Sequence, residues 1–284
     1  MSKYDFGISS FVLASPFTNQ DGSQFDYTRE MGFDLIEVCI EDPAQLSTAF
    51  LLTEQERTGL PISVCGAFGP NRDVSHEDPA MRQAGIDYLM LCVDIAEAVG
   101  SPHVAGPMYS ATGKTRMLSP EGRAEQRQWA ADSLREVADY AADKGVSLAI
   151  EPLNRFETDV VNTVEQGLQL FNLINRDNVG FMLDTFHMNI EEKHIGDAIR
   201  AAGSKVFHFQ VSENDRGTPG TGNVAWGETW QALDDIGYTG TIVIESFLPT
   251  VKEIARAVSL WRPVAPSMDS LARDGLAFLK QELP

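Results

Sequence analysis

The stretch GVSLAIEPLNRFETDVVNTVEQGLQLFNLINRDNVGFMLDTFHM, residues 145–188, decides the fold of this chain. It contains two short apolar runs, residues 146–150 and 179–183, and each run is followed directly by an acid, Glu151 and Asp184. Strands that are apolar on both faces are typical of a parallel sheet covered on both sides, and an acid at the end of such a strand lies at the rim of the sheet. Two consecutive strands therefore deliver carboxylates to one rim, which we interpret as a candidate site.

The same alternation of strand and helix extends along the whole chain in both directions. The sequence predicts strands at residues 6–12, 34–39, 60–66, 102–106, 146–150, 179–183, 205–211 and 241–244. It predicts helices at residues 25–31, 43–59, 79–99, 163–174, 195–202, 226–236 and 267–279, and a long helix that contains residues 129–141 on one face and is closed by Gly145. Repeats of about 30 to 35 residues predict a (β/α)₈ TIM barrel, α/β in class, as a single domain over residues 1–284. An open doubly wound sheet is the alternative, but no glycine-rich phosphate fingerprint follows the first predicted strand.

Composition limits the classes of partner. The chain has 22 Lys and Arg against 41 Asp and Glu, a formal net charge of -19, so most of its surface repels nucleic acid and anionic membranes. Its three cysteines are widely spaced and form no CxxC pair, which favours a reducing cytoplasm over a disulfide framework. Neither a signal peptide nor an apolar run of about 20 residues is present. We expect a soluble cytoplasmic protein.

The last four predicted strands each present a polar group at one mouth. These groups are Glu151, Asp184, the pair His208 and Gln210, and Glu245. In a TIM barrel the chemistry lies at this end of the strands, and carboxylates side by side require a cation between them. Oxygen ligands favour Mn²⁺ or Mg²⁺, with Co²⁺ able to substitute. Either His208 or Gln210 could be the fourth ligand, because imidazole binds metals better but the amide lies nearer the strand end.

Several neighbouring side chains are candidates for substrate contact. His187 follows Asp184 by three residues, and Arg216 lies on the loop after the seventh strand, where it could bind a substrate oxygen. Glu157 and Arg155 follow Glu151, and each residue taken alone also fits a structural role. The cysteines are interpreted as packing residues, although Cys65 at the end of the third strand could line the pocket. The remaining histidines are assigned structural or surface roles: His76, His103 and His194.

Five motifs carry a resemblance to a known family. They are IEPLNRFETDVVNT from residue 150, MLDTFHMNIEE from 182, SENDRGTPGTG from 212 with Trp226 after it, GYTGTIVIESF from 237, and WRPVAPSMDSLARDGLAFL from 261. The chain resembles the D-tagatose 3-epimerase and D-allulose (D-psicose) 3-epimerase family of xylose-isomerase-like barrels. The similarity is strong from about residue 145 to the C-terminus, and weaker but collinear before it.

The resemblance implies a dimeric or tetrameric barrel that holds Mn²⁺ or Co²⁺ through two Glu, one Asp and one His. Position by position, Glu151, Asp184 and Glu245 match metal ligands, and the two glutamates also match the pair that removes and returns the C3 proton. Glu157, His187 and Arg216 match the family residues that bind the end of the substrate carrying O1 and O2. Two further candidate substrate contacts are Cys65 and Phe247, the latter in the motif of Glu245.

Two departures from the family pattern bear on the substrate. Gln210 occupies the position of the family's metal-binding histidine, where the related hydroxypyruvate isomerases also have a glutamine. It is therefore predicted to be a neutral oxygen ligand that holds the metal less strongly than a histidine would. Residues 13–15 (LAS) and 109–111 (YSA) replace tryptophans in the loops after strands one and four, and these small residues predict a wider mouth. A wider mouth admits a larger substrate such as a 3-oxo-glycoside.

The sequence thus predicts a metal-dependent ketose 3-epimerase that acts through an enediolate, with a small carbohydrate as substrate and a homodimer or homotetramer as assembly. The alternatives are a lyase or epimerase acting on 3-oxo-glycosides, and a hydroxypyruvate-type isomerase, favoured by Gln210 alone. A sugar-binding barrel without catalysis is the non-enzymatic alternative, opposed by the intact pair Glu151 and Glu245.

Overall fold

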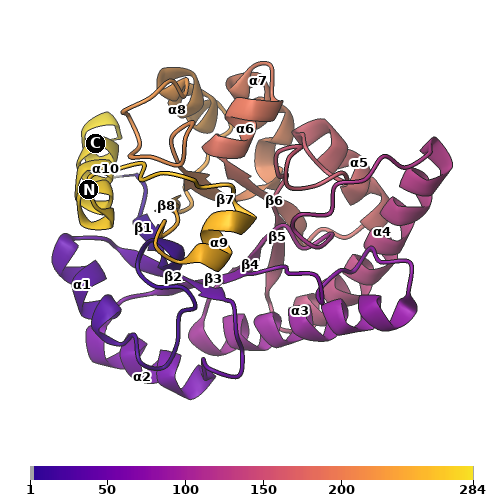
Figure 1. Ribbon diagram of the computed structural model, residues 1–284, viewed down its shortest axis with the longest axis horizontal. Coiled ribbons are helices and arrows are strands. Elements are labelled where there is room, and N and C mark those ends of the chain that lie inside the picture. The colour runs from indigo at the N-terminus through magenta and orange to yellow at the C-terminus, as the bar shows by residue number, and fades with distance from the viewer. Residues whose placement is uncertain (1–2, 284) are drawn as a thin grey trace.

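Eight parallel strands close into a barrel in chain order, and helices surround it (Figure 1). This is a computed structural model that describes residues 3–283. The strands are β1 Phe6–Ser9, β2 Leu35–Ile40, β3 Ile62–Gly66, β4 His103–Gly106, β5 Ser147–Ile150, β6 Val179–Asp184, β7 Val206–Val211 and β8 Ile242–Ile244. The helices are α1 Ser23–Met31, α2 Thr48–Thr58, α3 Pro79–Val99, α4 Pro120–Asp143, α5 Val164–Ile174, α6 Thr185–Glu191, α7 Ile195–Ala202, α8 Trp226–Asp235, α9 Lys252–Ala257 and α10 Met268–Glu282, with 3₁₀ turns η1 Ser10–Val12 and η2 Gly203–Lys205. The predicted TIM barrel is confirmed.

The boundaries differ from the predicted ones at a few places. The predicted first strand continues to residue 12, but Ser10–Val12 forms a 3₁₀ turn because Ser9 Oγ accepts a hydrogen bond from Phe11 N and caps it. Helix α2 begins only at Thr48, since Ser47 Oγ accepts from Phe50 N. Helices α6 and α9 were not predicted; α6 follows Asp184 without a loop, so its helical periodicity merges with the apolar strand before it.

The two faces of the strands form two separate layers. Side chains such as Ile36, Val38 and Ile40 of β2 point outward and join the large apolar core between barrel and helices. The alternate residues of the same strand, Glu37 and Cys39, point into the barrel. The interior therefore holds buried polar groups as well as apolar ones, and it lies directly beneath the candidate site.

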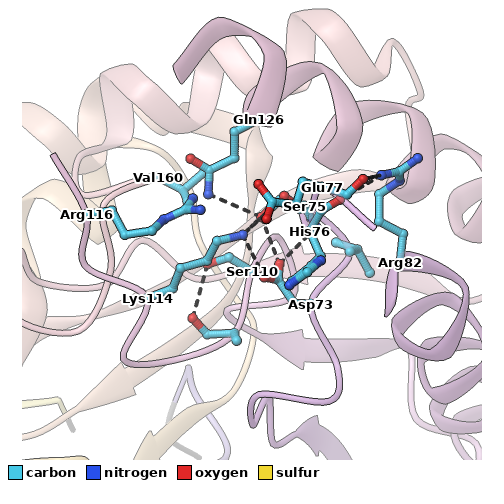
Figure 2. A network of polar contacts seen from close by, with 12 residues as sticks. Asp73, Ser75, His76, Glu77, Arg82, Ser110, Lys114, Arg116, Gln126 and Val160 are labelled. Atoms are coloured by element: carbon cyan, nitrogen blue, oxygen red, sulfur yellow. Dashed lines mark hydrogen bonds and ion pairs between the residues drawn. The ribbon is translucent and has the colours of Figure 1, made fainter. Parts of the chain in front are cut away.

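The loop after β3 and the loop after β4 are joined by a buried polar network (Figure 2). Lys114 Nζ lies 2.6 Å from Asp73 Oδ2 and donates to Ser75 Oγ at 3.0 Å, and the Lys114 and Asp73 side chains are only 9% and 3% exposed. Gln126 Nε2 of α4 donates to the same Ser75 hydroxyl at 3.4 Å. In addition, Gly113 N donates to Glu157 O at 2.7 Å. Three loops at the mouth are thereby fixed relative to one another.

Among residues 3–283, no helix is long and apolar enough to cross a membrane.

Candidate active site

A cavity of about 690 Å³ lies at the C-terminal ends of the strands. Seven of the predicted site residues line it: Cys65, Glu151, Glu157, His187, Arg216, Glu245 and Phe247. Helix α9, drawn in gold across the barrel in Figure 1, contributes Glu253 and Ile254 to the wall. Of the residues that replace the family's tryptophans, Ser15 lines the cavity. Tyr109 does not line it, because it is fully buried and donates its hydroxyl hydrogen to Val161 O.

The three predicted carboxylates are positioned by the strand ends. Glu151 follows β5, and its N–H donates to the carbonyl of Gly106 on β4 at 3.1 Å. Gly106 has φ +126, and an added Cβ there would lie 3.0 Å from Gly66 O, so only glycine fits this rim position. Asp184 ends β6 and caps α6 by accepting from Phe186 N at 2.8 Å. Glu245 follows β8, and its N–H donates to Val211 O at 3.1 Å.

Arg216 lies among these carboxylates. Its Nη1 donates to Asp184 Oδ2 at 2.5 Å and to Glu245 Oε2 at 2.9 Å. The guanidinium lies 3.9 Å from the ring centroid of Phe186 and 5.0 Å from that of Phe247, while its buried Nε has no hydrogen-bond partner. The positive charge of Arg216 compensates only part of the negative charge around it.

His187 faces the same group. Asn154 N–H donates to His187 Nδ1 at 3.0 Å, so the proton of the neutral ring lies on Nε2, which is 3.4 Å from Glu151 Oε1. Arg216 Nη2 also lies 2.9 Å from Nε2, yet it cannot donate to a nitrogen that carries its own proton. Burial, together with the charge of Arg216, holds the pKa of His187 well below its ordinary value. His187 is therefore neutral and oriented by Asn154.

Glu157 lies on the loop after β5 and is nearly buried. Its Oε1 accepts from Asn154 Nδ2 at 2.7 Å, so one asparagine orients both Glu157 and His187. Burial raises the pKa of Glu157 above its ordinary value. Arg155, by contrast, points away from the site and pairs with Glu191 at 2.9 Å.

Burial dominates the protonation of the carboxylates. It raises the pKa of Glu151 well above the ordinary value, and the neighbouring charges of Glu245 and Asp184 act in the same direction. Burial also raises the pKa of Asp184, and it raises that of Glu245 to about 8, in each case against the lowering effect of Arg216. The single positive charge of Arg216 is thus too little for the carboxylates around it. A bound cation would favour their ionised form.

The donor atoms fit a divalent metal ion. One ligand atom each of Glu151, Asp184 and His187 lies within 4.8 Å of the other two, and all three residues are buried. Glu245 is joined to Asp184 through Arg216 Nη1. Carboxylate oxygens are ligands that Mn²⁺ and related ions accept. His187, expected as a substrate contact, lies near the acids too, but its Nδ1 accepts from Asn154 and its Nε2 carries the ring proton, so neither nitrogen has a free lone pair for a metal ion.

Gln210 and His208 lie inside the barrel at different depths. Gln210 pairs in register with Asp184, the last residue of β6, and its buried Oε1 has no hydrogen-bond partner among residues 3–283. His208 lies one layer deeper, where its ring is 4.6 Å from that of His103 and its Nδ1 lies 3.1 Å from Thr241 Oγ1. An unpartnered amide oxygen at the level of Asp184 fits the donor set of a metal site better than the deeper imidazole does.

Two residues of the site were missed by sequence reasoning. Glu37 of β2 is fully buried; its Oε1 accepts from Gln210 Nε2 at 2.6 Å, and its Oε2 lies 2.6 Å from His208 Nε2. The sequence feature that could have identified Glu37 is an acid inside the otherwise apolar strand LIEVCI. Asn154, which orients His187 and Glu157, gave no comparable signal because asparagine is common in loops.

Comparisons with known proteins agree with the barrel fold. The model of the xylose isomerase-like TIM barrel family matches residues 25–282. The chain is 34% identical over 279 residues to a probable ketose 3-epimerase of Synechocystis sp., covering 98% of this chain and 96% of that protein. It is 35% identical over 265 residues to a D-psicose 3-epimerase of Agrobacterium fabrum, covering 90% and 91%. The crystal structure of a D-allulose 3-epimerase from Methylomonas sp. has a TM-score of 0.92 at 31% identity, covering 100% and 99% of the two chains.

Proposed function

Because this chain belongs to the xylose isomerase-like TIM barrel family, we propose that it is a divalent-metal-dependent ketose 3-epimerase. The relatives named as ketose and D-psicose 3-epimerases cover nearly the whole chain. The observation that carries the proposal is that Glu151 and Glu245 enter one cavity from β5 and β8, with Asp184 of β6 between them in strand order. Two carboxylates are the minimum for removing a proton from one face of a carbon atom and delivering one to the other.

The residues have separate roles in this reaction. One of the pair Glu151 and Glu245 accepts the C3 proton as the C3–H bond breaks, and the electron pair moves toward the C2 oxygen to form the enediolate. The other carboxylic acid then protonates C3 on the opposite face, which inverts the centre. Burial raises the pKa of both carboxyl groups above the ordinary value, which suits them to both steps.

The proposed cofactor is Mn²⁺, with Co²⁺ or Mg²⁺ as substitutes, held by Glu151, Asp184, Gln210 and Glu245. When bound, it supplies Lewis-acid polarisation of the substrate oxygens at C2 and C3. The O1 and O2 end of the sugar is bound by Glu157, His187 and Arg216, and Cys65 and Phe247 contact the rest of it. Support for these roles is that the five side chains line the same cavity.

Solvent exchange at C3 tests the proposal. The Mn²⁺-loaded protein is expected to exchange the C3 proton of D-fructose, D-allulose or D-tagatose with deuterium in D₂O, and EDTA is expected to abolish the exchange. Glu245→Gln is expected to lower the rate by about 10²- to 10⁴-fold, the usual contribution of a general acid or base. Glu253→Gln is the matched control, because Glu253 also lines the cavity but is exposed on α9. Unchanged exchange in Glu245→Gln would contradict the assigned role.

The size of the cavity favours a second candidate, an epimerase or lyase acting on 3-oxo-glycosides. A volume of about 690 Å³ lies in the upper half of the range for small-molecule pockets, about 300 to 1,000 Å³, and so leaves room for a glycoside. Release of a phenolic aglycone from a 3-oxo-glycoside, with no exchange at C3 of a ketose, would establish this reading. The third alternative, a hydroxypyruvate-type isomerase, is supported by Gln210 alone.

We further propose a cytoplasmic homodimer or homotetramer that binds neither nucleic acid nor membranes. The net charge of -19 opposes anionic partners, and the cysteines Cys39, Cys65 and Cys92 are all free thiols, as in a reducing compartment. Light scattering during gel filtration would give the mass of the assembly, and a mass of one chain would contradict the proposed oligomer.

A further inference from the structure

A second group of metal-ligating side chains lies inside the barrel, beside the carboxylate site. It consists of Glu37 and Cys39 on β2 and Cys65 on β3. Cys39 and Cys65 are directly opposite each other in the register of the two strands, and the Cys65 thiol donates to the carbonyl of Gly66 at 3.6 Å. The ligand atoms of the three residues all lie within 4.8 Å of one another, and all three residues are buried.

The surroundings of this group match those of a bound metal ligand. Metal-ligating carboxylates are usually held by outer hydrogen bonds, and Glu37 Oε1 accepts one from Gln210 Nε2 at 2.6 Å. Its other oxygen lies 2.6 Å from His208 Nε2, outside hydrogen-bond geometry. Ser9 Oγ lies 3.4 Å from Cys39 Sγ and is a further oxygen donor. An entry path exists as well, because Cys65 lines the cavity.

The chemistry of the donors selects the ion. Burial raises the pKa of Cys39, and the neighbouring Cys39 thiol together with burial raises the pKa of Cys65, so both are neutral thiols at pH 7. A hard ion such as Mn²⁺ or Mg²⁺ does not displace thiol protons effectively, whereas Zn²⁺ and Cd²⁺ bind thiolate strongly enough to do so.

We propose that Glu37, Cys39 and Cys65 form a second cation site that is selective for a thiophilic divalent ion such as Zn²⁺ or Cd²⁺. Each thiol releases one proton when its sulfur binds the ion, and no electron transfer occurs. Glu37 also holds the amide of Gln210, so an ion here competes for the group that orients the neighbouring site. We therefore expect thiophilic ions to inhibit the proposed epimerase; binding itself does not depend on the reaction that the enzyme catalyses.

Titration of metal-free protein with Cd²⁺ alone tests the site. The readout is the ultraviolet charge-transfer band between thiolate and cadmium, recorded in a buffer whose reductant contains no thiol. Wild-type protein is expected to develop the band to saturation at one Cd²⁺ per chain, with release of protons. Cys39→Ala and Cys65→Ala are each expected to lose the band, and Glu37→Met is expected to weaken Cd²⁺ binding at this site by about tenfold or more.

Two variants serve as controls. Cys92→Ala should keep the band, because Cys92 is buried on α3, outside the group of three ligands. Asp184→Asn should also keep it while losing Mn²⁺ binding, which separates this site from the carboxylate site. Far-ultraviolet circular dichroism checks folding, and Cys39→Ser and Cys65→Ser replace any alanine variant that does not fold.

The absence of a band in wild-type protein would overturn the proposal. Persistence of the full band in both Cys39 and Cys65 variants, or its loss in Cys92→Ala, would overturn it equally. Failure of ketose exchange would contradict the proposed function but would leave the band unaffected, so the two failures are distinguishable.

Discussion

Glu37 determines which atom of the Gln210 amide faces the proposed metal. The amide nitrogen donates to Glu37 Oε1 at 2.6 Å, so its oxygen is left free, and that oxygen is buried with no partner. The other oxygen of Glu37 lies 2.6 Å from Nε2 of His208, whose Nδ1 lies 3.1 Å from Thr241 Oγ1. A carboxylate thus orients Gln210 in the way that outer carboxylates orient metal-binding histidines.

At the scale of this residue we predict that Glu37→Met lowers the Mn²⁺ affinity of the carboxylate site by about 10- to 100-fold, the usual effect of losing such an outer partner. Methionine has a similar size but leaves the Gln210 amide without its acceptor. Titration calorimetry of the variant against wild type measures the change. Because Glu37 acts through Gln210, the double variant Glu37→Met/Gln210→Met should bind no more weakly than Gln210→Met alone; additive losses would show that the two residues act separately.

The raised pKa of Glu245 predicts a pH dependence of stability in the metal-free protein. Between its ordinary pKa of 4.5 and its folded value of about 8, the unfolded chain has lost a proton that the folded chain keeps. The free energy of unfolding therefore falls as the pH rises through this window, and the full stability contribution of the neutral carboxyl is present only below pH 4.5.

Glu245→Gln removes this titration. Urea unfolding of the metal-free proteins should show the variant gaining stability relative to wild type as the pH rises from 4.5 to 8, by about a few kcal/mol at most. Above that window the difference should stay constant. A difference that is the same on both sides of the window would refute the assigned pKa.

At the scale of elements, the mouth is held by contacts between loops as well as by the barrel. Lys114 of the loop after β4 pairs with Asp73 of the loop after β3, and both side chains are buried (Figure 2). The same loop donates from Thr112 N to Phe68 O at 2.8 Å and from Gly113 N to the carbonyl of Glu157 at 2.7 Å. Phe68, Thr112 and Glu157 all line the cavity, so this ion pair fixes part of its wall.

Lys114→Met should lower the free energy of unfolding by about 3 to 5 kcal/mol, because it leaves the buried Asp73 carboxylate without its countercharge, with hydrogen bonds from Ser75 to Oδ1 alone. We also expect the KM for a ketose to rise, since the loop that carries Glu157 loses its support. Arg116→Met is the control from the same loop: its partner is Asp159, its side chain is 40% exposed, and its loss should cost about 0 to 1 kcal/mol. The double variant Lys114→Met/Asp73→Asn should recover most of the stability, and no recovery would rule out the buried charge as the cause.

At the scale of the whole molecule, closure of the barrel brings acids from β5, β6 and β8 to one place. In the metal-free state Asp184 and Glu245 share the guanidinium of Arg216, and Glu151 lies 3.4 Å from His187 Nε2. A divalent ion that bound them would link three strands and relieve their repulsion, so it should stabilise the folded chain against unfolding.

Mn²⁺ at about 100 times its Kd should stabilise the protein by about 2.7 kcal/mol. For a chain of 284 residues that corresponds to a rise in Tm of about 5 °C. Differential scanning calorimetry measures the shift, and EDTA should reverse it. Asp184→Asn should show a much smaller rise; an equal rise would place the ion elsewhere.

The eight strands, the barrel and the acids at the strand ends are predictable from the sequence, because apolar periodicity and abrupt changes in polarity report local burial. The tertiary structure decided the partners of those acids. Glu37 and Gln210 are 173 residues apart and meet only because β2 and β7 face each other across the closed barrel. Arg216 likewise reaches Asp184 and Glu245 from a loop between their strands. A local pattern shows that a side chain is buried, whereas the contacts that it makes depend on strands distant in the chain, which only closure brings together.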